Sequence, residues 1–331
     1  MSEEQFGPLY PFIQDDEITD INWNGRRLWI EHLTKGRYSP DIFLPTAFVH
    51  QFTSHVSNVV SLNFNKHMPL LEAEANGLRI SIIHEAYAKS GRSISIRKSP
   101  PIQRLKEENL IKEGYCTKEQ LDFLKLCASA RMNILICGQT GSGKTELLKF
   151  LTRYIPEEDR VITIEDNLEI HYSSLHPDRD SVELKVDENH FTYTQAIKAC
   201  LRQMPDWILL SEARGNEVRH LMESLTTGHY CITTMHTDDV RKIPERIGNM
   251  VEDSIVAERI RREVYTFLDI AILVRRGADC VRYIDQIAAF DAKNKKVILL
   301  SEFGENHFNR LPENTREKFE RNEVYIPFYP V

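Results

Sequence analysis

A glycine-rich segment at 138–145, GQTGSGKT, fits the pattern G-x-x-x-x-G-K-[ST]. It follows an apolar run at 132–137 and precedes a helical run at 144–154, which is the strand, loop and helix context that the pattern requires. Its glycines let the backbone curl so that successive N–H groups point at phosphate oxygens, and the helix N-terminus adds partial positive charge. The segment predicts a triphosphate site with the binding residues Gly138, Gln139, Thr140, Gly141, Ser142, Gly143, Lys144 and Thr145.

The last two residues of this segment, Lys144 and Thr145, would bind different parts of the ligand. Lys144 would reach the β- and γ-phosphates, and the Thr145 hydroxyl would hold Mg²⁺. The structural alternative is a glycine-rich turn that binds nothing, and the flanking strand and helix argue against it. A dinucleotide site is a poorer fit because the loop lacks G-x-G-x-x-G phasing.

Acidic residues follow two further apolar runs. The run 161–164 leads into Glu165 and Asp166, and the run 207–210 leads through Ser211 into Glu212. A hydrolase needs a carboxylate that orients or deprotonates water at the strand ends where the phosphates lie. We expect Glu212 to activate water, and Glu165 with Asp166 to serve the Mg²⁺ shell or assist catalysis, although the acids at either strand end could simply be solvated there.

Two histidines, His229 and His236, flank the apolar run 231–235. An imidazole at this position can hydrogen-bond the γ-phosphate or relay its loss, and we predict this catalytic role for His229. Taken alone, a histidine is more often structural. The two histidines and Cys231 could suggest a zinc site. Such a site is disfavoured because the phosphate loop needs this region for its own ligands.

Beyond residue 116, short apolar strands alternate with helical segments. This alternation predicts an α/β domain at 117–331 whose mostly parallel sheet is covered on both faces. The predicted strands are 132–137, 161–164, 207–210, 231–235 and 271–274, with a closing hairpin at 281–290 and 296–300.

The first 98 residues predict a smaller α+β domain. Segments 18–24 and 27–33 alternate apolar and polar residues around Asn24-Gly25, which is a strong hairpin signal. Prolines at 100 and 101 then open a charged stretch, so we predict a linker at 99–116.

Composition and charge exclude several classes of protein. The chain of 331 residues carries 42 Lys and Arg against 49 Asp and Glu, and this net charge of −7 argues against a dedicated nucleic-acid binder. Apolar runs such as 134–137 are far shorter than the roughly 20 residues that cross a bilayer. The acidic start lacks the basic beginning of a secretory signal. The six cysteines show no C-x-x-C spacing, which favours reduced, buried thiols in a cytoplasmic protein.

Four segments follow one another in a fixed order: GQTGSGKT (138–145), TIEDNLEI (163–170), ILLSEARG (208–215) and TTGHYCITTMHT (226–237). Together they resemble the Walker A, aspartate-box, Walker B and histidine-box motifs of the secretion-superfamily ATPases, which power type II and type IV secretion and type IV pilus assembly or retraction. The resemblance covers most of 7–275. It implies ATP and Mg²⁺ as cofactors, a RecA-like P-loop NTPase domain with a smaller α+β amino-terminal domain, and a hexameric ring.

The sequence departs from the commonest family pattern at the second acidic motif. Ser211 and Ala213 stand where Gly and Val or Met are more usual, so Mg²⁺ would rely on Thr145 and Glu165. The chain also lacks the tetracysteine insertion and long amino-terminal extension of the type II branch. These differences favour the compact type IV secretion and tight-adherence pilus branch.

Basic residues gather at the end of the first domain, where they could be brought to a γ-phosphate by domain closure. Such cations couple hydrolysis to hinge motion, and by family position we favour Arg79 and Arg97 as catalytic residues over Arg92. A solvated basic edge strand is the alternative. The set consists of Arg79, Lys89, Arg92, Arg97, Lys98 and Arg104, with Glu85 as its one acid.

The resulting hypothesis is an ATP-hydrolysing motor whose first domain rocks on the linker. It would act on a membrane platform or secretion-channel protein, so its association with the cytoplasmic membrane would be indirect and would involve no insertion. One rival is a nucleic-acid translocase with a RecA-like core, disfavoured by the charge and by the lack of an aromatic and basic stacking strip. The other is a nucleotide-gated scaffold that does not hydrolyse ATP, to which Ser211 gives slight support.

Overall fold

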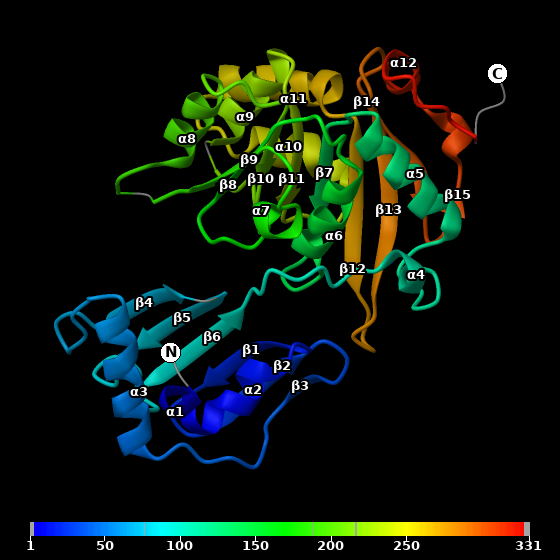
Figure 1. The fold of residues 1–331 in the computed structure, drawn as a ribbon. Helices are drawn as coiled ribbons and strands as arrows, with labels where there is room; N and C mark the ends of the chain where they lie inside the picture. Colours follow the sequence, from blue (N-terminus) through cyan, green and yellow to red (C-terminus); the bar gives the residue numbers. More distant parts are fainter. Residues whose placement is uncertain (1–2, 76, 188, 216, 328–331) are drawn as a thin grey trace. The chain divides into compact units, whose positions relative to one another are not determined.

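The amino-terminal unit, Met1–Pro100, is built on a six-stranded antiparallel sheet (Figure 1). The computed structural model describes residues 3–75, 77–187, 189–215 and 217–327. In spatial order the strands are β3 Gly36–Tyr38, β2 Leu28–His32, β1 Ile18–Trp23, β6 Ser93–Lys98, β5 Leu78–Ile83 and β4 Leu70–Ala75. The helices of the unit are α1 Glu3–Phe6, α2 Tyr10–Gln14 and α3 Thr46–Val59.

The predicted hairpin at the start of this unit is confirmed. Strands β1 and β2 pair across a turn in which Gly25 has φ +89° and the Asn24 side chain accepts hydrogen bonds from the N–H groups of Arg26 and Arg27. Alternate residues of the strands, such as Ile21 and Ile30, enter a core that Phe52 of α3 completes. The opposite face of the sheet keeps its polar residues, which is why the sequence alternates.

The second unit, Pro101–Val331, contains a nine-stranded sheet. Its strands in spatial order are β15 Glu305–Asn306, β14 Lys296–Glu302, β13 Arg282–Asp291, β12 Ile270–Arg276, β7 Ile134–Cys137, β11 Tyr230–Met235, β10 Trp207–Leu210, β8 Val161–Glu165 and β9 Ser181–Lys185. From β12 to β9 every neighbouring pair is parallel, and β13, β14 and β15 extend the sheet antiparallel.

Helices cover both faces of this sheet, and the central strand shows why its sequence is continuously apolar. Ile134 and Ile136 of β7 belong to one core cluster, whereas Leu135 and Cys137 belong to the other. The first cluster includes residues of α5 Lys118–Ser129, α6 Lys144–Leu151, α7 Tyr172–Leu175 and α12 Glu313–Arg321. The second includes residues of α8 Tyr193–Cys200, α9 Glu217–Thr226, α10 Ile243–Gly248 and α11 Ser254–Phe267.

The expected fold class is confirmed, an α/β unit with a mostly parallel sheet beside a smaller α+β unit. The predicted strands are present, with ends that differ by one or two residues. Strand β9 and helix α12 were not expected from the sequence. Among the described helices, none combines the length and the apolar character that crossing a bilayer demands.

The charged stretch after Pro100 belongs to the second unit in this structure. It contains the short helix α4 Glu107–Leu110, and Leu110, Tyr115 and Cys116 are buried in the first core cluster. The linker role of 99–116 stays a prediction. The last part of this stretch packs into the core of the second unit.

The parallel strands align so that their carboxyl ends form one edge. Cys137 of β7 pairs with Met235 of β11, and Leu210 of β10 pairs with Ile164 of β8. In sheets of this type, ligands bind outside the carboxyl ends of the strands. A ligand-binding site is therefore expected at the segments that follow β7, β8, β10 and β11.

Candidate functional site

The glycine-rich segment forms the loop between β7 and α6. Gly143 precedes the helix with φ +95°, a conformation that residues with a side chain rarely adopt. Gly138 is needed for a different reason. Its main chain packs closely against β12, and a Cβ atom at this position would overlap the carbonyl oxygen of Val274. The two positions explain why glycine is needed at the beginning and at the end of the loop.

The loop presents several main-chain N–H groups for which the described part of the chain provides no acceptor. Among the residues that the structure describes, none accepts a hydrogen bond from the N–H of Gly141, Gly143 or Lys144, whereas the N–H of Ser142 donates to the Gln139 carbonyl at 3.2 Å. These groups lie at the N-terminus of α6, where the helix dipole adds positive potential. The arrangement can bind an anion with several oxygens.

Lys144 is held against the loop rather than extended into solvent. Its Nζ donates to the carbonyl oxygens of Gly138 and Gln139, both at 3.1 Å, and lies 3.3 Å from Nδ1 of His236. The side chain is 8% exposed, and burial lowers the pKa of the ammonium group although the charge of Glu212 opposes this shift. A phosphate would provide the anionic partner that these neutral groups do not.

Glu212 follows β10 and is contacted through both carboxylate oxygens. Oε1 lies 3.0 Å from Nε2 of His236, and Oε2 lies 2.8 Å from Nε of Arg214. Arg214 also reaches Asp166, with 3.0 Å between NH1 and Oδ2. A chain of polar contacts thus runs from Lys144 through His236, Glu212 and Arg214 to Asp166, and it joins the segments after four strands.

His236 occupies a central position among these contacts. Its Nδ1 lies 3.3 Å from Nζ of Lys144 and 3.2 Å from the Gly138 carbonyl oxygen, while its Nε2 lies 3.0 Å from Glu212. One side chain therefore contacts both the phosphate loop and the acidic residue after β10.

The structure places the two histidines at opposite ends of one strand. Strand β11 runs parallel to β7, so His229 lies before its amino end and His236 after its carboxyl end. Nδ1 of His229 lies 2.9 Å from Oγ1 of Thr227 and 3.2 Å from the Ser224 carbonyl, at the end of α9. His236 is therefore the histidine that contacts the loop in this structure, and the catalytic role of His229 stays a prediction.

The acidic residues after β8 also differ from expectation. Glu165 is fully buried, and its Oε2 accepts hydrogen bonds from the N–H groups of Glu169 at 2.8 Å and Ile170 at 3.0 Å. The Thr145 hydroxyl donates to Oε2 of Glu169 at 3.2 Å. Glu169, which lies in the 163–170 motif but was not singled out, is thus the carboxylate that faces the predicted metal-binding hydroxyl, in place of Glu165.

The donor set at this point fits Mg²⁺. A threonine hydroxyl with a carboxylate nearby provides oxygen donors, which hard divalent cations prefer. The described residues contain no group of three or more His, Cys, Asp or Glu side chains that could hold a metal ion alone.

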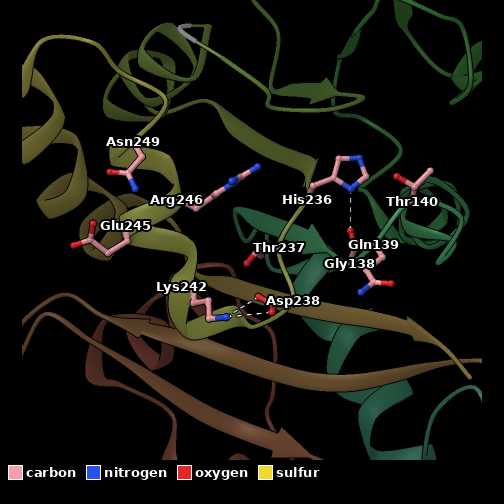
Figure 2. Close-up of a pocket in the computed structure, with 10 residues that line it drawn as sticks. All are labelled: Gly138, Gln139, Thr140, His236, Thr237, Asp238, Lys242, Glu245, Arg246 and Asn249. Atoms are coloured by element: carbon pink, nitrogen blue, oxygen red, sulfur yellow. Dashed lines mark hydrogen bonds and ion pairs between the residues drawn. The ribbon is translucent and has the colours of Figure 1, made fainter.

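A cavity of about 750 Å³ opens beside the loop (Figure 2). Figure 2 shows His236 directed toward the loop at Gly138, and Lys242 paired with Asp238 at 2.9 Å. Beyond the loop residues and the segment 236–238, the wall is formed by four residues of the α10 region: Lys242, Glu245, Arg246 and Asn249. The loop therefore has an open side from which a ligand can approach.

An arginine of β13 contacts the loop from another element. Nε of Arg282 donates to the Gly141 carbonyl at 3.3 Å, and its Cδ would lie 3.1 Å from a Cβ placed on Gly143. Nothing in the sequence around position 282 indicated this contact, because it depends on the register of the β12 and β13 hairpin.

The predicted arginines of the first unit lie side by side on its sheet. Arg79 of β5 pairs in register with Arg97 of β6, and both side chains are exposed. Nε of Arg97 lies 3.0 Å from Oδ1 of Asp20. Their action on a phosphate stays a prediction.

Arg92, which the sequence analysis ranked below these two, has a different setting. It makes a two-pronged contact with Glu85, with distances of 2.7 and 2.9 Å, and is 11% exposed. The hydrogen bond from Arg92 is the main cause that lowers the pKa of Glu85 to about 2. Arg92 is thus committed to an ion pair within the first unit.

Comparisons with known proteins place these features in a family. The family model described as "Type II/IV secretion system protein" matches residues 69–296. An uncharacterized protein of Bacillus anthracis is 29% identical over 330 residues, with coverage of 95% of this chain and 74% of the relative. The type IV secretion system protein VirB11 of Brucella suis is 28% identical, with coverage of 88% and 91%.

Among solved structures, the ATPase DotB of Yersinia pseudotuberculosis has a TM-score of 0.67 at 16% identity. The match covers 89% of this chain and 81% of that structure. At this identity the likeness shows the fold.

We expect replacement of Lys144 by Ala to weaken binding of a non-hydrolysable ATP analogue by about 10- to 100-fold, because a charged donor to the phosphates is lost. Titration of a fluorescent analogue measures this. Lys118→Ala, which removes an ammonium from a side chain that is 75% exposed, is the matched control. Unchanged affinity in Lys144→Ala would remove the loop from the binding site.

A second expectation concerns the metal. Thr145→Ala should raise the Mg²⁺ concentration needed for half-maximal turnover about tenfold, because one oxygen donor is missing. Thr145→Ser keeps the hydroxyl and should behave like the wild type. Identical Mg²⁺ curves for all three proteins would show that the hydroxyl does not hold the metal.

Proposed function

Because the chain belongs to the type II/IV secretion system protein family, we propose that it is an ATP-hydrolysing motor of a type IV secretion or pilus machine. The observation that carries the proposal is the set of groups at one edge of the large sheet. At this edge Lys144 contacts the loop carbonyl oxygens and His236, and His236 contacts Glu212. The next residue of the loop segment, Thr145, donates to Glu169.

In this proposal the triphosphate takes the place of the present partners of Lys144. The ammonium group exchanges the carbonyl oxygens of Gly138 and Gln139 for phosphate oxygens, a stronger charge-assisted contact. The N–H groups of Gly141 and Gly143 add further donors. Binding is favourable because these donors are already arranged before the ligand arrives.

Thr145 would hold Mg²⁺, and bound Mg²⁺ would neutralise charge on the phosphate oxygens. Glu212 is our candidate for the residue that orients water and accepts its proton. In the described structure its carboxylate is shared by His236 and Arg214, so a rearrangement of these contacts would precede its action. Glu169, which accepts a hydrogen bond from the Thr145 hydroxyl, would orient this hydroxyl and nearby water.

The proposal that ATP hydrolysis drives a movement is based on the family to which the chain belongs. We propose that six copies form a ring, that Arg79 and Arg97 of the first unit supply cations to the γ-phosphate, and that hydrolysis moves this unit. The motor would act on a membrane platform or channel protein at the cytoplasmic membrane without inserting into it. Sizing of the purified chain with and without an ATP analogue and Mg²⁺ tests the ring, and a monomer under both conditions would contradict it.

The central experiment compares steady-state ATP turnover of the wild type and Glu212→Gln. The wild type should hydrolyse ATP, and the variant should lose about 10²- to 10⁴-fold in kcat because the amide cannot accept the proton from water. Binding of the analogue should persist, since Lys144 and the loop are unaltered. Equal and negligible rates for both proteins would favour a nucleotide-gated scaffold, and strong stimulation by single-stranded DNA would favour a translocase.

The arginines have their own test. Arg97→Ala should lower kcat by about 10³-fold while changing analogue affinity much less, as expected for a cation that acts on the transition state. Arg26→Ala, an exposed arginine of the same unit, is the control. An unchanged rate in Arg97→Ala would assign this arginine to the surface pair with Asp20 alone.

A further inference from the structure

Glu165 is an acidic side chain with no exposure to solvent at the edge of the sheet that carries the candidate site. It is the last residue of β8 and is 0% exposed. Its Oε2 accepts two main-chain hydrogen bonds, from Glu169 at 2.8 Å and from Ile170 at 3.0 Å. Its other oxygen, Oε1, has no hydrogen-bond partner among the described residues.

These two bonds fix the end of the turn that follows β8. The start of the turn has a separate anchor, because the N–H of Asp166 donates to the Tyr193 hydroxyl at 3.0 Å. The end of the turn carries Glu169, whose carboxylate accepts from the Thr145 hydroxyl at 3.2 Å. The carboxyl group of Glu165 therefore holds the main chain of the residue that faces the first turn of α6.

We propose that Glu165 is a positioning residue that acts through Glu169. Its buried carboxyl oxygen holds the N–H groups of Glu169 and Ile170, and so keeps the Glu169 carboxylate on Thr145. This inference rests on the proposed function, in which Thr145 and Glu169 serve ATP hydrolysis. It replaces the expectation that Glu165 itself contacts the metal ion or the attacking water.

The N–H groups of Glu169 and Ile170 need a hydrogen-bond acceptor at the side chain of residue 165, and this acceptor does not have to carry a negative charge. A single oxygen accepts both bonds, and described residues provide no cation or N–H donor for the second oxygen. An isolated buried carboxylate costs free energy, whereas a neutral carbonyl group accepts the same two bonds.

The protonation behaviour of the group agrees with this. Burial is the main cause that raises the pKa of Glu165 to about 8, and the negative charges of Glu169 and Glu183 act in the same direction. The main-chain hydrogen bonds from Glu169 and Ile170 oppose the shift.

The test compares Glu165→Gln, which keeps a carbonyl acceptor of the same size, with Glu165→Met, which keeps the length and removes the acceptor. Glu165→Gln should keep kcat within about threefold of the wild type, because its amide oxygen can accept both N–H bonds. Glu165→Met should lose about 10²-fold in kcat, since a small misplacement at a reacting centre has effects of this size. The KM for ATP should change little in both, because the loop and Lys144 are intact.

Amide hydrogen exchange provides a readout that does not depend on turnover. The Glu169 and Ile170 amides should exchange faster in Glu165→Met than in the wild type and should stay protected in Glu165→Gln. Glu169→Gln, which keeps Glu165 and its two bonds, is the matched control and should leave both amides protected while lowering kcat.

Two results would overturn the inference. Loss of kcat in Glu165→Gln as large as in Glu169→Gln would mean that the charge of Glu165 is used directly. Wild-type kcat in a folded Glu165→Met would mean that its bonds do not position anything needed for hydrolysis. Absence of turnover in the wild type is a different outcome, since it would contradict the proposed function itself.

Discussion

The ammonium group of Lys144 lies inside a loop that offers it two carbonyl oxygens and an imidazole nitrogen. No ion pair with a carboxylate is formed by this group within the described ranges, and burial lowers its pKa. A buried cation without its own anion is unfavourable, so a ligand with negative charge would stabilise the loop. The alignment of the parallel strands serves this requirement, because it brings the segments after β7, β8, β10 and β11 to the same edge.

The loop is also connected to the antiparallel part of the sheet. Arg282 of β13 donates to the Gly141 carbonyl on one side of the loop. From the same strand, Gln286 accepts a hydrogen bond from the N–H of Val240, a few residues after His236. One strand therefore contacts both the phosphate loop and the segment that follows the site histidine.

The sequence was sufficient to predict the fold class, the loop between β7 and α6 and the location of Glu212 after a strand of the same sheet, because local pattern and strand direction determine these features. It was not sufficient to choose between Glu165 and Glu169, since the turn after β8 directs the first side chain into the protein and the second toward Thr145. Strand direction indicates His236 rather than His229 as the histidine at the loop, because in a parallel sheet the residue after the strand is the one at the ligand edge.

Other features had no local signal. Strand β9 is short and only partly buried, and helix α12 is mostly polar, with Thr315 and Phe319 as its buried residues. The contact of Arg282 depends on hairpin register, which a spacing pattern does not encode. The sequence thus indicated the residues that bind through the main chain better than those that contact the loop from distant elements.

The close approach of Gly138 to the Val274 carbonyl has a consequence for how sequences of this fold can vary in length. Both faces of β7 are apolar, so hydrophobicity alone would tolerate a shift of this strand by one residue. The contact with β12 fixes the strand and the loop in a single alignment. Insertions and deletions should consequently be rare between the start of β7 and the first turn of α6, and they should gather in the surface connections on the opposite edge of the sheet.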